Sequence, residues 1–131
     1  MTRLTMTQLP PDRPMILLVD DDAALRTALK FSLELEGFDV ETYESAEALL
    51  LRDDVERQAC MVVDLNLPGI DGLEAVRQMR LRGVNHPALL ITSHPRPAVR
   101  DGAAALGAAI VEKPLLGDQL MGEIRAALAA H

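Results

Sequence analysis

Short apolar runs alternate along the chain with stretches that repeat at helical spacing. Most of these runs are uniformly apolar, as in strands covered on both faces, and one has the mixed polarity of a strand near a sheet edge. Strands that alternate with helices through short links predict an α/β fold, with a parallel sheet and helices on both of its faces. The expected strands are residues 15–19, 39–43, 60–63, 88–91 and 109–111.

Capping residues indicate where the helices between these strands begin and end. Asp22 and Ser45 have side chains that commonly cap helix N-termini, and Gly37 and Gly83 are typical of positions just beyond a helix. The expected helices are residues 23–36, 46–52, 72–82, 98–106 and 116–130.

The length and charge of the chain exclude several classes of protein. Its 131 residues suffice for one domain, and its net charge of −7 argues against nucleic-acid binding or an anionic membrane as partner. One cysteine, Cys60, cannot form an intramolecular disulfide, and we find no signal-peptide pattern or run of membrane-spanning length. We expect a cytoplasmic protein, with residues 1–14 as a flexible N-terminal extension and residues 15–131 as the domain.

Polar residues follow the predicted strands at the same edge of the sheet. Asp20 and Asp21 follow the first strand, Asp64 the third, Thr92 the fourth and Lys113 the fifth. The carboxyl ends of parallel strands meet at one crevice, so we expect these side chains to lie together. Clustered carboxylates repel one another unless a cation compensates, and Mg²⁺ prefers oxygen ligands and shares them with phosphate. The sequence therefore predicts a Mg²⁺ site, for which a backbone carbonyl after Asp64 is a natural further ligand.

Asp64 also meets the requirements of a nucleophile, because its carboxylate is expected at a strand end that opens to the crevice. Attack of a carboxylate on a phosphoryl group gives an aspartyl phosphate. The transferred group is negatively charged and needs positive partners, which a cation and Lys113 supply. The hydroxyl of Thr92 adds a hydrogen bond, so these groups together predict a phosphoryl-accepting site.

In these residues the sequence resembles the receiver domain of two-component response regulators, from about residue 15 to residue 128. Segments 44–47 and 111–114 are closest to receivers of the nitrogen-fixation and nitrate-response type. The resemblance implies a flavodoxin-like (βα)5 fold with a five-stranded parallel sheet of order 2-1-3-4-5 and five flanking helices. The matching residues stand in the order of the family and at domain-scale spacing: Asp20, Asp21, Asp64, Thr92, Lys113 and Pro114.

The resemblance implies a metal-binding role for four residues. Asp64 would be the phosphoacceptor and, with Asp21 and the backbone carbonyl of Asn66, would bind Mg²⁺. Asp20 would act on the ion through water.

The resemblance also implies how the phosphoryl group is held and sensed. Lys113 would bridge to the phosphoryl group. The peptide bond between Lys113 and Pro114 is cis in this family. Thr92 would move towards the phosphate and carry the signal. The donor would be a sensor histidine kinase or a histidine phosphotransfer protein, and the chain would be a signalling switch and no turnover enzyme.

The family's usual partner surface corresponds to residues 98–128, which we expect to bind an output partner or a second copy of the chain. The sequence ends at His131, just after the last expected helix. We therefore expect either a receiver that acts alone or a segment of a longer regulator. No direct contact with nucleic acid or membrane is expected.

The sequence departs from the family pattern between the fourth strand and the lysine. Ile110 stands where receivers usually carry Phe or Tyr, so the usual coupling of threonine to a rotating aromatic ring is in doubt. The segment between Leu106 and Ile110 is one residue short. Together with Pro95, Pro97 and Gly102, this predicts a displaced or loosely formed fourth helix.

Two alternatives to the signalling switch stay open. One is a degenerate receiver that acts as a phosphorylation-independent interaction module; the intact Asp21, Asp64, Thr92 and Lys113 argue against it, and Ile110 keeps it open. The other is a phosphohydrolase with an aspartate nucleophile. The second class would normally need an acidic residue two positions after Asp64, where this sequence has Asn66.

Overall fold

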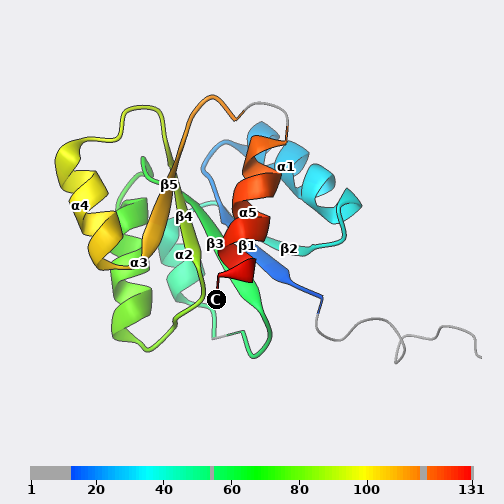
Figure 1. The fold of residues 1–131 in the computed structure, drawn as a ribbon, viewed down its shortest axis with the longest axis horizontal. Helices are drawn as coiled ribbons and strands as arrows, with labels where there is room; N and C mark the ends of the chain where they lie inside the picture. The colour runs from blue at the N-terminus through cyan, green and yellow to red at the C-terminus, as the bar shows by residue number, and fades with distance from the viewer. Residues whose placement is uncertain (1–12, 54, 116–117, 131) are drawn as a thin grey trace, which may run out of the picture.

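The computed structural model describes residues 13–53, 55–115 and 118–130. Strands and helices alternate along these residues in the predicted order, and each strand begins and ends within one residue of its predicted bounds (Figure 1). The strands are β1 (Met15–Val19), β2 (Asp39–Tyr43), β3 (Ala59–Asp64), β4 (Ala88–Thr92) and β5 (Ala108–Glu112). The helices are α1 (Ala23–Leu35), α2 (Ala46–Leu50), α3 (Gly72–Leu81), α4 (Pro97–Ala105) and α5 (Gln119–Ala129).

The strands form one parallel sheet in the order β2-β1-β3-β4-β5, which confirms the predicted fold class and strand order. The mixed-polarity strand, β2, lies at an edge as predicted. In the register of the sheet, Val19 is opposite Val63, and Leu90 is opposite both Val63 and Ile110. The carboxyl ends of β1, β3, β4 and β5 therefore lie in one row.

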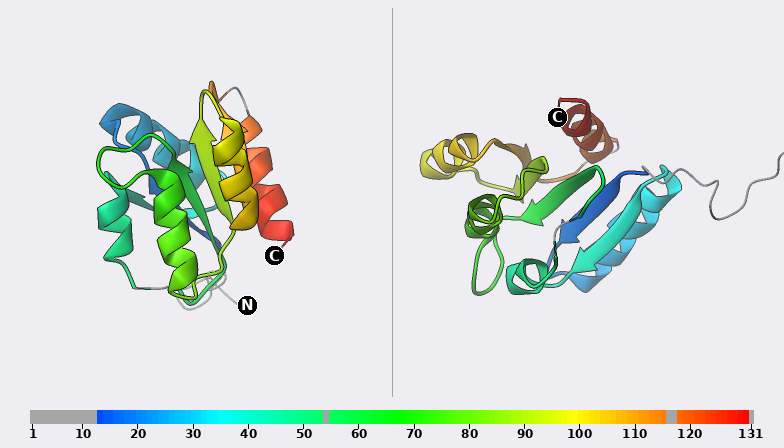
Figure 2. Two further views of the ribbon diagram at one scale, coloured as in Figure 1. Left: turned by 90° about the vertical axis from the view of Figure 1, so that its left-hand side faces the viewer. Right: turned by 90° about the horizontal axis from the view of Figure 1, so that it is seen from below.

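Alternate strand residues face opposite sides of the sheet, so the sheet separates two layers of aliphatic core. Leu17, Met61 and Leu90 belong to the layer that packs against α2, α3 and α4. Cys60 and Ile16 belong to the layer that packs against α1 and α5 (Figures 1 and 2). Cys60 is fully buried, and burial raises the pKa of its thiol to about 12.

The predicted capping side chains hold the starts of two helices. The carboxylate of Asp22 accepts the N–H of Leu25 at 3.1 Å, and the hydroxyl of Ser45 accepts the N–H of Ala48 at 3.1 Å. Helix α2 ends two residues earlier than predicted. The predicted start of the last helix at Leu116 lies outside the described residues.

The predicted N-terminal extension, residues 1–14, is described only at Arg13 and Pro14. The side chain of Arg13 donates a hydrogen bond to the carbonyl of Gly37 at 2.9 Å, and the N–H of Asp39 donates to the carbonyl of Pro14 at 3.0 Å. These two residues therefore contact the domain. The remainder of the extension lies outside the described residues, and its flexibility stays a prediction.

The fourth helix is regular, so the prediction that it would be loosely formed is wrong. Pro97 takes the first helical position, where a missing N–H leaves no helical hydrogen bond unmade. Gly102 faces α3, and a Cβ atom there would lie 2.9 Å from a methyl carbon of Leu73. The glycine thus allows close helix packing, which offsets its low helix propensity.

A short turn joins α4 to β5, in keeping with the shortened segment noted in the sequence. Leu106 and Gly107 form this turn, and Gly107 has the positive φ of +69° that glycine adopts without strain. Ile110, in the strand that follows, is half-buried against the core layer that it shares with Leu73 and Leu90. A small aliphatic side chain therefore occupies the position at which the family usually has a ring.

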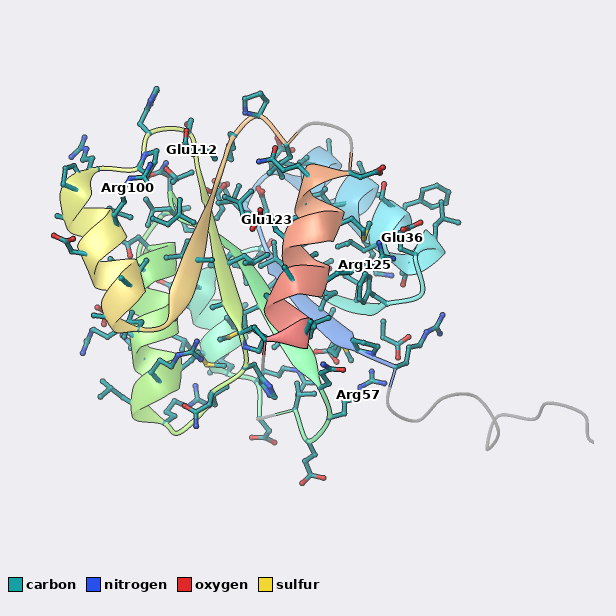
Figure 3. The ribbon with its side chains drawn as sticks, in the orientation of Figure 1. Glu36, Arg57, Arg100, Glu112, Glu123 and Arg125 are labelled. Atoms are coloured by element: carbon teal, nitrogen blue, oxygen red, sulfur yellow. The ribbon has the colours of Figure 1, made fainter. Side chains whose placement is uncertain are left out.

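Ion pairs connect helices to neighbouring elements (Figure 3). Arg125 of α5 pairs with Glu36, just after α1, at 3.1 Å, and its guanidinium lies 5.8 Å from the ring centroid of Phe38. Arg100 of α4 pairs with Glu112 of β5 at 3.0 Å. These pairs are about half exposed, so we expect each to contribute little to stability.

Arg80 of α3 connects its helix to the segment before β4 and to the turn after α4. Its half-buried guanidinium donates hydrogen bonds to the carbonyls of Val84 at 2.9 Å, His86 at 2.8 Å and Leu106 at 2.9 Å. Burial lowers the pKa of Arg80. One side chain therefore fixes both the link into β4 and the end of α4.

We predict that Arg80→Met lowers the free energy of unfolding by about 2 kcal/mol, because three carbonyls lose a charged donor while the aliphatic packing is kept. Denaturant titration measures the change. Arg77→Met is the matched control on the same helix, since Arg77 is exposed and pairs with Glu74 one turn away. Equal losses in the two variants would contradict the bridging role of Arg80.

Candidate functional site

The carboxyl ends of the neighbouring strands β1 and β3 bring three carboxylates together. Asp20 and Asp21 directly follow β1, and Asp64 is the last residue of β3. One oxygen atom from each of the three side chains lies within 4.8 Å of the others. Asp20 and Asp64 are each 5% exposed, whereas Asp21 is exposed. The sequence prediction of a carboxylate cluster at this edge is confirmed.

Both oxygens of Asp64 have a partner. Lys113 donates to Oδ2 from its ammonium group at 3.2 Å, and the backbone N–H of Asn66 donates to Oδ1 at 3.1 Å. Lys113 is placed by the end of β5, where its own N–H donates to the carbonyl of Thr92 at 2.9 Å, and its bond to Pro114 is cis as predicted. The structure therefore brings the predicted lysine to the predicted acceptor.

Repulsion and burial act together on Asp20. Burial raises the pKa of Asp20; the N–H of Asp22, which donates to its Oδ1 at 2.8 Å, opposes this, and the negative charge of Asp64 raises it further. The positive charge of Lys113 lowers it, without cancelling the net rise. A second cation, Arg26 of α1, donates to the backbone carbonyl of Asp20 at 2.6 Å. The cluster thus holds more negative charge than its neighbours neutralise.

Thr92 ends β4 on the far side of Asp64 from β1. Ile91 is opposite Asp64 in the register of β3 and β4, so Thr92 lies one residue beyond the position that faces Asp64. Its side chain is 1% exposed, and its hydroxyl oxygen accepts the N–H of His94 at 3.4 Å. A pocket of about 330 Å³ lies beside it, lined by Leu65, Asn66, Asp71, Thr92, Ser93, His94, Arg96 and Val99.

The chemistry of the cluster fits a hard divalent cation. Its ligand atoms are carboxylate oxygens, which Mg²⁺ prefers, and a bound cation would relieve the repulsion that raises the pKa of Asp20. Asp20, Asp21 and Asp64 would hold the ion. The role of the Asn66 backbone carbonyl as a further ligand stays a prediction. Asn66 is exposed and stands two residues after the end of β3.

Sequence reasoning missed Arg26. Its guanidinium contacts the main chain of Asp20, yet in the sequence it is an ordinary basic residue on the predicted helix after the first strand. A side chain that binds a backbone carbonyl has no complementary residue type to search for. No signal in the sequence would therefore have identified it.

Residues 16–125 match the family described as the response regulator receiver domain, which includes every residue of the cluster. The chain belongs to this family. The resemblance first seen in the sequence is thereby confirmed, and the receiver's cluster lies where the matching strands end.

Similar proteins include several named transcriptional regulators. The receiver is 35% identical over 114 residues to the transcriptional regulatory protein FixJ of Bradyrhizobium diazoefficiens, covering 86% of this chain and 56% of FixJ. It is 37% identical over 118 residues to the response regulator MprA of Mycobacterium avium, covering 86% of this chain and 50% of MprA. The structure of full-length FixJ from B. japonicum aligns with a TM-score of 0.78 and 34% identity, over 88% of this chain and 57% of that one. The receiver thus spans about half the length of these relatives.

We predict that Asp64→Asn lowers the raised pKa of Asp20 in metal-free buffer, because one neighbouring negative charge is removed while the burial remains. A carboxyl-carbon NMR titration measures it. An acid whose pKa is raised by folding costs stability as the pH rises through that pKa. The variant should therefore be more stable than wild type at neutral pH, by a margin that shrinks in acid.

Asp71→Asn is the matched control for this titration. It removes the same charge from the residue that caps α3, which lies outside the cluster, and asparagine caps helices as well as aspartate. An Asp20 pKa that moves equally in both variants would contradict a local repulsion between Asp20 and Asp64.

Proposed function

We propose that Asp64 of this receiver accepts a phosphoryl group from a phosphohistidine, carried by a sensor histidine kinase or a histidine phosphotransfer protein. The observation that carries this proposal is the contact between Asp64 and Lys113 at 3.2 Å, inside a cluster of three carboxylates. A buried carboxylate with a cation on one oxygen and further carboxylates nearby suits a site that gains a charged group and a metal ion together.

In the transfer, a carboxylate oxygen of Asp64 attacks phosphorus. The bond between phosphorus and the histidine nitrogen breaks, and its electron pair stays on the imidazole, which leaves and takes up a proton. Bound Mg²⁺ would supply positive charge to the transferred group's oxygens and to the carboxylates. Lys113 would pair with a phosphoryl oxygen, which its 3.2 Å contact with Asp64 supports, and the Thr92 hydroxyl would donate a hydrogen bond to another.

The proposed product is a phosphorylated receiver whose altered surface changes partner binding. On this proposal the chain is not a turnover enzyme, since each transfer modifies the protein itself. The surface of residues 98–128, formed by α4, β5 and α5, would bind an output partner or a second copy. A cytoplasmic location stays a prediction; within the described ranges, we find no helix that is both long and apolar enough to cross a membrane.

We predict that a small phosphodonor labels the wild-type receiver in the presence of Mg²⁺ and that Asp64→Asn takes up no label. Removing Mg²⁺ with a chelator should abolish the labelling. Asp101→Asn, on the exposed side of α4, should label like wild type. Intact-mass measurement of one phosphoryl group per chain checks the result.

The same experiment separates the alternative functions. An unlabelled wild type would support the phosphorylation-independent module, and release of phosphate in large excess over protein would support a phosphohydrolase. Mg²⁺ alone should also stabilise the fold, by about 2.7 kcal/mol at a hundredfold excess over its dissociation constant. Thermal unfolding with and without the ion therefore tests the metal site apart from the transfer.

We predict that the phosphate mimic beryllofluoride, with Mg²⁺, increases the apparent mass of the receiver towards that of a dimer. Light scattering after size-exclusion chromatography measures it. Ala104→Glu places a charge on the exposed side of α4 and should keep the protein monomeric. A wild-type mass that the mimic leaves unchanged would exclude a second copy of the chain as the partner of this surface.

A further inference from the structure

Glu47 of α2 contacts the loop that follows the acceptor strand. Its carboxylate accepts the backbone N–H of Ile70 at 3.1 Å, across more than twenty residues of sequence. The same oxygen, Oε2, lies where a side chain on Gly69 would begin, so that a Cβ there would collide with it. Gly69 also has a positive φ of +76°. The loop backbone is therefore shaped around this carboxylate.

The loop that Glu47 contacts, residues 65–71, is also anchored at both of its ends. Leu65 donates its N–H to the carbonyl of Ile91 at 2.9 Å and accepts the N–H of Gly72 at 2.9 Å. A Cβ on Gly72 would collide with the carbonyl of Asp64, so the start of α3 is pressed against the acceptor residue itself. Between these anchored ends, Glu47 holds the far side of the loop.

We propose that Glu47 is a positioning residue for the phosphoacceptor site. By holding the backbone at residues 69–70, it fixes the loop path that carries Asn66, whose N–H binds Asp64 and whose carbonyl is the predicted further ligand of Mg²⁺. This inference rests on the proposed function for the role of the ion. Glu47 touches neither the acceptor nor the carboxylate cluster, so it acts through the loop.

The proposal predicts an effect on metal affinity that a hydrogen-bond acceptor restores. Glu47→Ala removes the acceptor and should raise the dissociation constant for Mg²⁺ by roughly three- to tenfold, the equivalent of the net contribution of one ordinary hydrogen bond. Glu47→Gln keeps an acceptor oxygen at the same length and should stay within about twofold of wild type. Calorimetric titration of the full chain with Mg²⁺ measures all three.

Glu44→Ala is the matched control. Glu44 is exposed and stands three residues away, and its side chain makes no hydrogen bond or ion pair with the described residues, but its removal changes the net charge equally. Labelling by a small phosphodonor adds a second readout. Glu47→Ala should label slowly at low Mg²⁺ and approach the wild-type rate at saturating Mg²⁺.

Gly69→Ala tests the contact from the loop side. The new methyl group collides with the carboxylate and is strained at positive φ, so Mg²⁺ affinity should fall. Adding Glu47→Ala relieves the collision, and the double variant should bind Mg²⁺ no more weakly than Gly69→Ala alone. Simple addition of the two losses would mean that the residues act independently.

Several results would overturn the proposal. These are a Glu47→Ala affinity within twofold of wild type, an equal loss in Glu47→Gln, or an equal loss in Glu44→Ala. A lower unfolding temperature with unchanged Mg²⁺ affinity would reduce Glu47 to a purely structural role. If wild type binds Mg²⁺ but takes no label, the proposed function fails, while the affinity comparison still decides the role of Glu47.

Discussion

Repulsion between carboxylates at the ends of β1 and β3 is the constraint on which this receiver depends. Asp20 and Asp64 are almost fully buried, and Asp21 stands beside them, so the fold must hold like charges close together. Lys113 offsets part of that charge. The energetic cost of the remaining repulsion has to be offset by the packing of the sheet, whose two aliphatic layers fix the strand ends from both faces. A cation bound at this cluster would relieve the repulsion.

The cost explains why the surroundings of the cluster are built from backbone hydrogen bonds. The N–H of Asp22 binds Asp20, and the N–H of Asn66 binds Asp64. Such donors satisfy a carboxylate without adding a mobile side chain to the crevice, and they leave its other lone pairs free for a cation. They also make the site depend on loop geometry. Any residue that fixes the loops, such as Glu47, therefore acts on the carboxylates from a distance.

The sequence was sufficient for the fold and for the carboxylate cluster because both follow from strand ends. Uniform apolar runs predict buried parallel strands, and whatever follows such runs must meet at one edge. The side chains that bind backbone were not predictable. Arg26, Glu47 and Arg80 each contact a main-chain group, and main-chain groups are the same at every position. The fourth helix was misjudged for a related reason, since the contact of Gly102 with Leu73 exists only once two helices have packed.

On the proposed function, transmission from the site to the surface would have to differ from a mechanism based on a rotating ring. Ile110 is half-buried against the core and has no ring to exchange between two positions. Arg80 holds the end of α4, and Gly102 packs tightly on α3. The end of α4 nearest Thr92 is instead joined to it by four residues, 93–96, without a capping side chain at the helix start. If Thr92 moves on phosphorylation, as the proposed function implies, the shift would act first on the start of α4, because the other end is held to α3.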